Sequence, residues 1–170
     1  MKEYTCCFFG HRKIKITDGQ RKMLYSTIEK LIIEENVYIF LFGSKSKFDD
    51  LCYEVVSELK EIYPFIRRIY VRAQLPYIDN DYKCYLLQSY EDTYFPEHMI
   101  NAGKSAYVER NYDMINKSKF CVAYFDENYT PYVQNKKSVV LSSCVKKSGA
   151  RIAYDYAIKK QKTIINIFGI

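Results

Sequence analysis

Residues 5–12 read Thr-Cys-Cys-Phe-Phe-Gly-His-Arg, and this stretch decides the fold class of the chain. Its first five residues are apolar or small without alternation, which is typical of a strand buried on both faces of a parallel sheet. Gly10 permits a tight turn or the close approach of a ligand. His11 and Arg12 follow at the carboxyl end of the strand, where open α/β sheets bind ligands, and a guanidinium can grip a phosphate with two N–H groups. The alternative is a plain turn with two solvated side chains.

Strand and helix patterns alternate along the rest of the chain. Apolar runs predict further strands over 37–42, 66–71, 93–95, 120–125 and 163–168. Helices are expected between them, over 18–35, 48–63, 79–86, 104–118 and from 148 onward, with a capping box at Thr17-x-x-Gln20. Residues 127–147 have no stable period, and we expect a mobile loop there. The alternation predicts an α/β fold, namely a Rossmann-like, open, mostly parallel sheet with helices on both faces, in a single domain over 1–170.

The composition is that of an ordinary globular chain with an unusual number of tyrosines. Of the 170 residues, 48% are hydrophobic and 27% are charged, and 18 tyrosines and 10 phenylalanines stand beside no tryptophan. Tyrosine packs at core edges, but it also stacks on planar ligands and lines interfaces. The net charge of +6 arises from residues 127–170, which hold eight basic and two acidic residues. This local excess attracts phosphates but is weaker than the basic stripe of a nucleic-acid-binding protein.

The six cysteines do not suggest a metal site. They form no Cys-x-x-Cys pair and have no histidine at ligand spacing. Cys6, Cys7, Cys52 and Cys121 lie in apolar patterns, where a free thiol behaves as a small hydrophobe. The chain shows no signal peptide and no apolar run long enough to span a bilayer. We therefore expect reduced thiols, a cytoplasmic protein, no membrane association, and no metal or other cofactor.

Polar or glycine-containing clusters occur where predicted strands end or predicted helices begin. Gly43-Ser44 and Ser148-Gly149 each precede a helix, whose free N–H groups and dipole favour an anion, although a capping serine alone is routine. Arg72 and Asp126 follow two further strands. Because the carboxyl ends of parallel strands share one edge, these groups and residues 10–12 are expected to converge on a phosphate-bearing ligand. Neither Gly-x-Gly-x-x-Gly nor a Walker-type glycine loop occurs, which excludes a standard NAD or ATP loop.

Four segments follow one another in an informative order. They are the strand ending in residues 10–12, the turn over 42–51 (Phe-Gly-Ser-x-Ser-x-Phe-Asp-x-Leu), the stretch 109–118 (Glu-Arg-Asn with Ile-x-x-Ser), and residues 148–157 (Ser-Gly-Ala-x-x-Ala-x-x-Tyr-Ala). Together they resemble the SLOG superfamily, the Rossmann-like group that includes lonely-guy phosphoribohydrolases and Smf-type DNA-processing proteins. The match is nearest to its small, stand-alone bacterial and phage branch and covers nearly the whole chain outside 127–147.

The resemblance implies a nucleotide-derived ligand at the carboxyl edge of the sheet. Asp49 has an alternative role as a first-turn acid that satisfies the helix dipole. Arg110 and Asn111 have an alternative role as an exposed helix face with one packed amide. With the groups expected at the strand ends, the candidate ligand-binding residues are Gly10, His11, Arg12, Gly43, Ser44, Asp49, Arg72, Arg110, Asn111, Asp126, Ser148 and Gly149.

The chain departs from the phosphoribohydrolases at their catalytic signature. Their Pro-Gly-Gly-x-Gly-Thr-x-x-Glu motif is absent, and the corresponding residues 148–153 read Ser-Gly-Ala-Arg-Ile-Ala. Cleavage of a glycosidic bond needs a carboxylate near the anomeric carbon. Glu109 is the candidate for this catalytic role, followed by Asp126 and Asp49.

Three functions stay open on the sequence. The first is a non-catalytic binder of a nucleotide or nucleotide-derived signal, acting as sensor or sequestering protein, since SLOG domains of bacterial defence systems bind cyclic ADP-ribose-like signals. The second is an enzyme acting at an N-glycosidic bond, as a phosphoribohydrolase or deoxyribosyltransferase does. The third is a DNA-binding module using the lysines of 127–162, but no reading helix is recognisable. We favour the first, do not expect nucleic acid as the partner, and note that the family often forms homo-oligomers.

Overall fold

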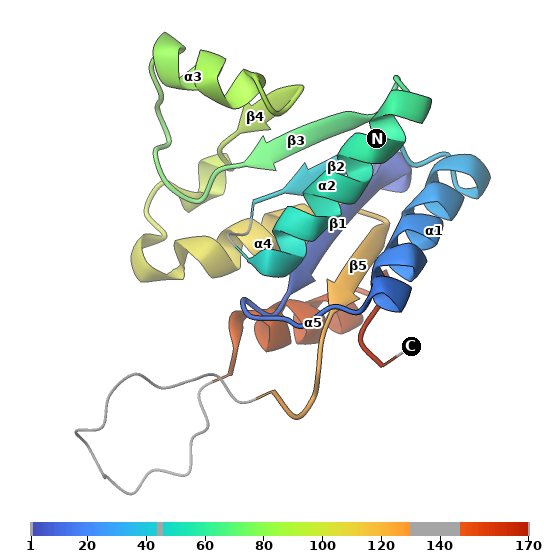
Figure 1. Cartoon of the computed structure of the whole chain (residues 1–170). Coiled ribbons are helices and arrows are strands. Elements are labelled where there is room, and N and C mark those ends of the chain that lie inside the picture. The colour runs from blue at the N-terminus through green and yellow to red at the C-terminus, as the bar shows by residue number, and fades with distance from the viewer. Residues whose placement is uncertain (1, 44–45, 130–146, 170) are drawn as a thin grey trace, which may run out of the picture.

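The computed structural model describes residues 2–43, 46–129 and 147–169, and within them strands and helices alternate (Figure 1). The strands are β1 (Thr5–Gly10), β2 (Ile39–Phe42), β3 (Arg67–Val71), β4 (Asp92–Tyr94), β5 (Phe120–Tyr124) and β6 (Thr163–Asn166). The α-helices are α1 (Asp18–Glu34), α2 (Lys47–Ile62), α3 (Asn80–Leu87), α4 (Ala106–Lys117) and α5 (Gly149–Lys159). Short 3₁₀ turns lie at Lys2–Tyr4, Glu97–Met99 and Gly103–Ser105.

The six strands form one sheet in the order β4-β3-β2-β1-β5-β6, and every pairing is parallel. The chain moves outward from β1 to β4 and then returns to place β5 on the other side of β1. This reversal makes the carboxyl ends of β1 and β5 a topological switch point, the usual ligand position in open α/β sheets. The predicted Rossmann-like α/β fold with a mostly parallel sheet is confirmed.

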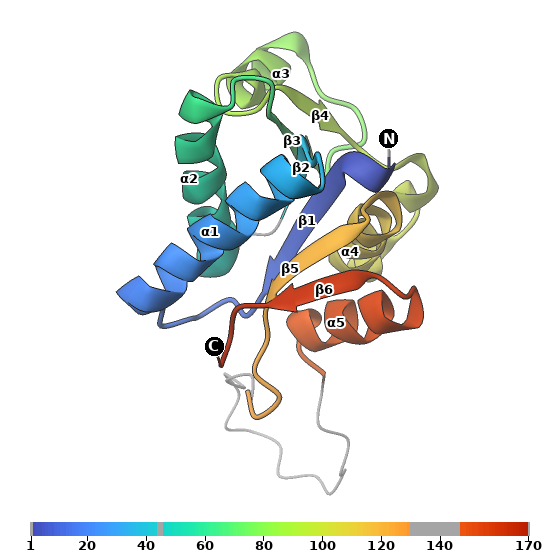
Figure 2. The ribbon, with the colours of Figure 1, turned by 90° about the vertical axis from the view of Figure 1, so that its right-hand side faces the viewer.

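Two apolar layers cover the two faces of the sheet. Side chains of β1 alternate between them, since Cys6 and Phe8 pack with α1 and α2 whereas Cys7 and Phe9 pack with α4 and α5. Figure 2 shows α1 and α2 on one side of the strands and α4 and α5 on the other. The unbroken apolar run therefore has the physical cause inferred from the sequence, namely burial on both faces.

The helix starts follow the predicted cap chemistry. Thr17 and Gln20 form the expected capping box, and the side chains of Ser46, Asp79 and Ser148 each accept a hydrogen bond from the first turn of the following helix. Some predicted bounds were wrong at their ends, because β2 begins at residue 39, α4 begins at 106, and β5 and β6 end at 124 and 166. Most of the predicted 127–147 loop, residues 130–146, lies outside the described residues.

The thiols have the environments that their sequence positions predict. Cys6, Cys7, Cys52 and Cys121 are buried and unpaired by disulfides, whereas Cys84 is exposed. No group of three or more potential metal-ligating side chains occurs within the described residues. Among the described helices, none is long and apolar enough to span a bilayer.

Candidate functional site

The carboxyl end of β2 is occupied by a buried arginine from α4. Arg110 is 3% exposed, and its Nη1 donates a hydrogen bond to the carbonyl oxygen of Gly43. A Cβ at position 43 would lie 2.7 Å from this Nη1 and 2.8 Å from the carbonyl oxygen of Val71. The missing side chain of Gly43 therefore makes the space that the guanidinium occupies.

Three further groups surround the Arg110 guanidinium. The Arg110 Nε donates a hydrogen bond to Oδ1 of Asn111 at 3.0 Å. The central carbon of the guanidinium lies 5.8 Å from the centre of the Tyr107 ring. Burial lowers the pKa of Arg110, and the nearby charge of Asp49 opposes that shift. Asp49 is itself buried in the first turn of α2, directly after the Ser46 cap. The fold thus brings together four of the predicted ligand residues from three elements.

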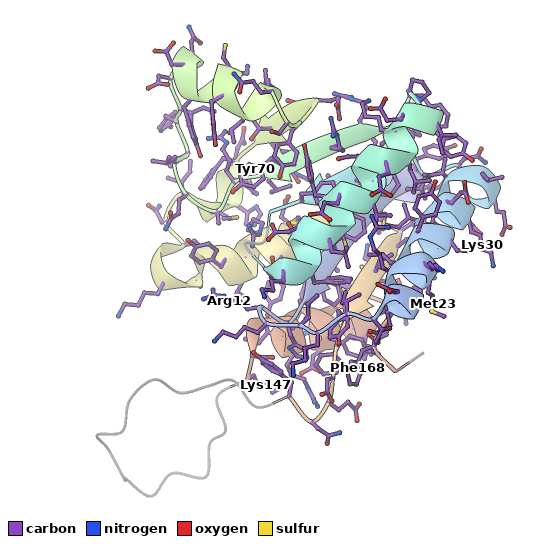
Figure 3. All side chains as sticks on the ribbon, in the orientation of Figure 1. Arg12, Met23, Lys30, Tyr70, Lys147 and Phe168 are labelled. Atoms are coloured by element: carbon purple, nitrogen blue, oxygen red, sulfur yellow. The ribbon has the colours of Figure 1, made fainter. Side chains whose placement is uncertain are left out.

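The carboxyl end of β3 contributes a second buried arginine. Arg72 is 9% exposed, and its Nη1 donates to the carbonyl oxygens of Leu75 and Pro76 in the connection to α3. Its Nε is buried without a hydrogen-bond partner among the described residues. Burial raises the pKa of the neighbouring Tyr70, and the charge of Arg110 opposes this. Figure 3 shows Tyr70 and Arg12 on the side of the molecule to which β1, β2 and β3 point.

A second cluster, made of His11, Asp126 and Tyr129, lies where the carboxyl ends of β1 and β5 meet. His11 is 2% exposed, and its Nε2 accepts a hydrogen bond from the backbone N–H of Asp126 at 2.9 Å. The same Nε2 lies 3.2 Å from the carbonyl oxygen of Asp126, and Nδ1 is buried without a hydrogen-bond partner among the described residues. Burial lowers the pKa of His11, and the ring stacks on Tyr129 at 3.9 Å between centroids. His11 therefore joins the ends of two strands that are distant in sequence.

Asp126 and Gly10 also have structural partners at this end of the sheet. The Asp126 carboxylate accepts the backbone N–H of Asn128 at 2.8 Å, which closes the turn after β5. A Cβ on Gly10 would lie 2.6 Å from the Phe48 ring, so the glycine accommodates core packing at this position. Arg12 is exposed, and its carbonyl oxygen accepts the N–H of Lys47 at the start of α2.

The other predicted residues lie nearer α5. Ser148 caps that helix through its hydroxyl oxygen, which accepts the N–H of Arg151 at 3.1 Å, and Gly149 is exposed. Glu109 is half-buried one helical turn before Tyr112, whose ring stacks on Tyr156 of α5 at 3.8 Å. Glu109 and Arg110 are adjacent on α4, so their side chains point about 100° apart around the helix axis, and Arg110 is the one that reaches the end of β2. Ser44 lies outside the described residues.

Tyr70 and Tyr107 are components of the Arg110 cluster that sequence reasoning missed. Tyr70 precedes Arg72 by two residues on β3, so the two side chains share one face of the sheet. Tyr107 precedes Arg110 by three residues on α4, which puts them on neighbouring parts of one helix face. These two spacings were available in the sequence and would have identified both tyrosines.

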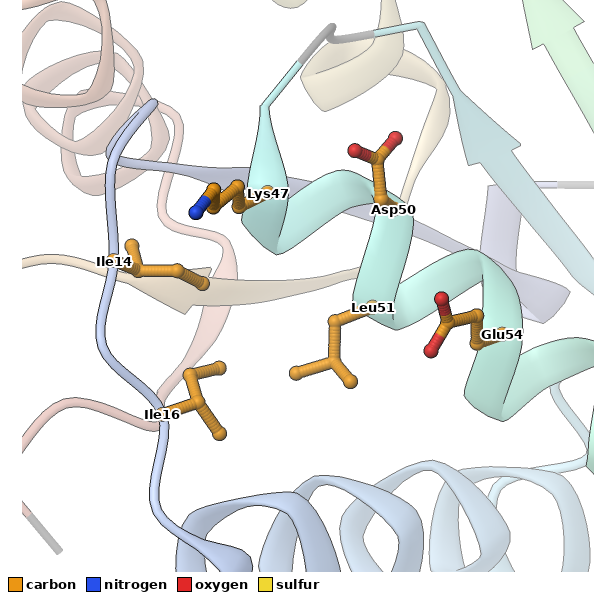
Figure 4. Close-up of a pocket in the computed structure, with 6 residues that line it drawn as sticks. All are labelled: Ile14, Ile16, Lys47, Asp50, Leu51 and Glu54. Atoms are coloured by element: carbon orange, nitrogen blue, oxygen red, sulfur yellow. The ribbon is translucent and has the colours of Figure 1, made fainter.

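A pocket of about 330 Å³ lies elsewhere, between α2 and the segment that leads into α1 (Figure 4). Its apolar lining comes from Ile14, Ile16 and Leu51. Lys47, Asp50 and Glu54 add one positive and two negative side chains. The two carboxylates outnumber the single lysine, and the lining includes none of the predicted ligand residues.

Three of the described basic residues in the C-terminal part, Lys147, Arg151 and Lys162, have polar partners within the fold. Lys147 and Arg151 pair with Asp155 at 2.9 and 3.3 Å. The Lys162 ammonium donates to the carbonyl oxygens of Asn116 and Ser118 at the end of α4. Internal pairing of these cations weakens the case for a continuous nucleic-acid surface over 147–162.

Comparison with known proteins identifies no match to a protein-family model and none to a curated protein. The SLOG resemblance stays a prediction from the sequence.

Proposed function

We propose that the protein is a SLOG-type domain that binds a nucleotide or nucleotide-derived signal at the carboxyl edge of its sheet and acts as a sensor or sequestering protein. One observation carries the proposal, namely that the buried Arg110 guanidinium bonds the carbonyl of Gly43 directly before the N-terminal turn of α2. A guanidinium stays charged at every physiological pH, and the first turn of a helix favours a neighbouring anion. A phosphate is the ligand group that both features select.

The aromatic groups beside Arg110 support a nucleotide over a simple inorganic anion. Tyr107 is half-exposed next to the guanidinium of Arg110, and Tyr70 lies on β3, the strand that pairs with β2. Flat phenol rings offer a planar ligand a stacking surface. A phosphate group bound by Arg110 would bring a sugar and base attached to it within reach of these rings.

A second candidate function is cleavage or transfer at an N-glycosidic bond. The observation that favours it is the presence of two carboxylates close to Arg110, since Asp49 is buried near the guanidinium and Glu109 precedes it on α4. Glu109 points about 100° away from Arg110 around the axis of α4, however, and a catalytic carboxylate must contact the anomeric carbon. Binding without turnover is therefore the function that the arrangement supports better.

One experiment separates the two functions. The purified protein is incubated with nucleoside monophosphates, deoxynucleosides, NAD and cyclic nucleotides, and mass spectrometry measures both protein-bound nucleotide and free base. We expect an intact nucleotide that is released on denaturation and is absent from Arg110→Gln. Free base that disappears in Glu109→Gln would establish the glycosidic reaction instead. If no nucleotide is retained or cleaved at millimolar concentration, the proposed function is wrong.

A further inference from the structure

Arg72 is a buried cation whose hydrogen bonds are incomplete. Its Nη1 is held by the carbonyl oxygens of Leu75 and Pro76, but its Nε has no acceptor among the described residues although the side chain is more than nine-tenths buried. Buried donors without acceptors are rare in folded proteins and call for an explanation. The Nε edge of a guanidinium is the edge that grips a phosphate in a two-pronged contact.

The two buried arginines reach the same edge of the sheet from different anchors. Arg110 extends from α4 to the end of β2, and Arg72 follows β3 directly. The two strands are neighbours, with Phe42 paired to Tyr70 in the register. Tyr70 lies within electrostatic range of both guanidinium groups, since its phenol affects the pKa of each.

The two arginines are anchored to different parts of the backbone. Arg110 is tied to the Gly43 carbonyl, and Arg72 is tied to a turn in which Leu75 adopts the left-handed φ of 57°. With these carbonyl bonds kept, each guanidinium can hold an anionic group of its own.

We propose that Arg72 forms a second phosphate subsite, so that the ligand carries two phosphate groups, one at Arg110 and one at Arg72. This inference rests on the proposed function and specifies its ligand class, a nucleotide with two phosphates and not a nucleoside monophosphate. The phosphate at Arg110 is common to both classes, and the phosphate at Arg72 distinguishes them.

The test measures the affinities of AMP, ADP and adenosine 3′,5′-bisphosphate by isothermal titration calorimetry. Wild-type protein should bind at least one two-phosphate probe about tenfold or more tightly than AMP, as expected for one added charged hydrogen-bonding contact. Arg72→Gln should remove this advantage and leave AMP affinity unchanged, whereas Arg110→Gln should weaken all three probes. Arg67→Gln is the matched control, because Arg67 is an exposed cation at the opposite end of the same strand.

The outcomes separate the two proposals. Two-phosphate probes that bind no more tightly than AMP, or an Arg72→Gln variant that weakens AMP equally, would overturn the second subsite and leave nucleotide binding intact. A wild-type protein that binds none of the probes would overturn both. If Arg72→Gln unfolds, Arg72→Lys keeps the charge without the two-pronged edge, and it should still lose part of the two-phosphate advantage and none of the AMP affinity.

Discussion

Replacing Gly43 by alanine tests the central contact of the candidate site. The new Cβ would lie 2.7 Å from Nη1 and 2.9 Å from Cδ of Arg110, and 2.8 Å from the carbonyl oxygen of Val71. The Arg110 side chain can move, but the Val71 carbonyl belongs to the adjacent strand and cannot yield without disturbing the sheet. Gly43→Ala should therefore displace the guanidinium and separate β2 from β3.

The loss in the free energy of unfolding caused by Gly43→Ala has two contributions that overlap. Overpacking a well-filled interior costs about 1–3 kcal/mol. Losing a charged hydrogen bond costs about 1.5–3 kcal/mol. Because one displacement causes both, we expect a loss of about 2–4 kcal/mol in the free energy of unfolding, which lowers the Tm of a chain this size by about 5–15 °C.

Gly149→Ala is the matched control, since both glycines belong to the predicted ligand set. No heavy atom lies within 4 Å of the Cβ position at Gly149, which is the first residue of α5. The substitution should leave the free energy of unfolding unchanged or raise it by up to about 1 kcal/mol, because alanine restricts the unfolded chain. Urea denaturation and thermal unfolding measure both variants. The packing argument is refuted if Gly43→Ala is as stable as the wild-type protein, or if Gly149→Ala loses as much free energy of unfolding as Gly43→Ala.

Three further predictions concern groups outside this contact. In an NMR titration His11 should show a pKa below 6.5 because of burial, with exposed His98 as the other histidine signal. Because the His11 pKa is lower in the folded state, the unfolded chain binds the proton more tightly. The contribution of His11 to the free energy of unfolding should therefore be greatest above pH 6.5 and be lost as the pH falls through the folded-state pKa. His11→Phe should abolish this contribution to the pH dependence. Cys84→Ser should remove a thiol that reacts rapidly in the native protein, whereas Cys6 and Cys52, whose pKa is raised by burial, should react only after unfolding. Tyr94→Phe should destabilise the fold by about 1.5–3 kcal/mol in urea denaturation, because buried Asp113 loses a 2.7 Å hydrogen bond, while Tyr77→Phe on the surface should have no effect.

Short-range patterns predicted most of the fold. The apolar run at 5–9, the capping box at Thr17 and the helix start at Ser148 were interpretable, because each signal acts within a few residues. Element ends were less predictable. Val37, for example, is apolar and buried but precedes β2, with its N–H bonded to the end of α1.

The sequence predicted that the site would lie at the carboxyl edge of the sheet, but it did not predict which residues would contact one another there. The sequence indicated that His11, Gly43 and Asp126 would lie at carboxyl ends of strands, and Arg110 joined the candidate set through the SLOG resemblance. It did not indicate that Arg110 would bond Gly43, 67 residues away, or that Asp126 would bond His11, 115 residues away. The sequence pattern is the same whether these side chains are buried or exposed to solvent, so it could not predict their burial.

The sequence by itself determined the elements and the face of each strand, since hydrophobic periodicity and cap chemistry are local. The tertiary structure alone decided the strand order and the burial of the two arginines at neighbouring strand ends. The physical reason is that Arg72 and Arg110 are held by bonds to backbone carbonyls outside their own helix or strand, and no local pattern specifies which carbonyl will be near. Long-range packing places these acceptors, and it thereby creates the two cations from which the ligand class is inferred.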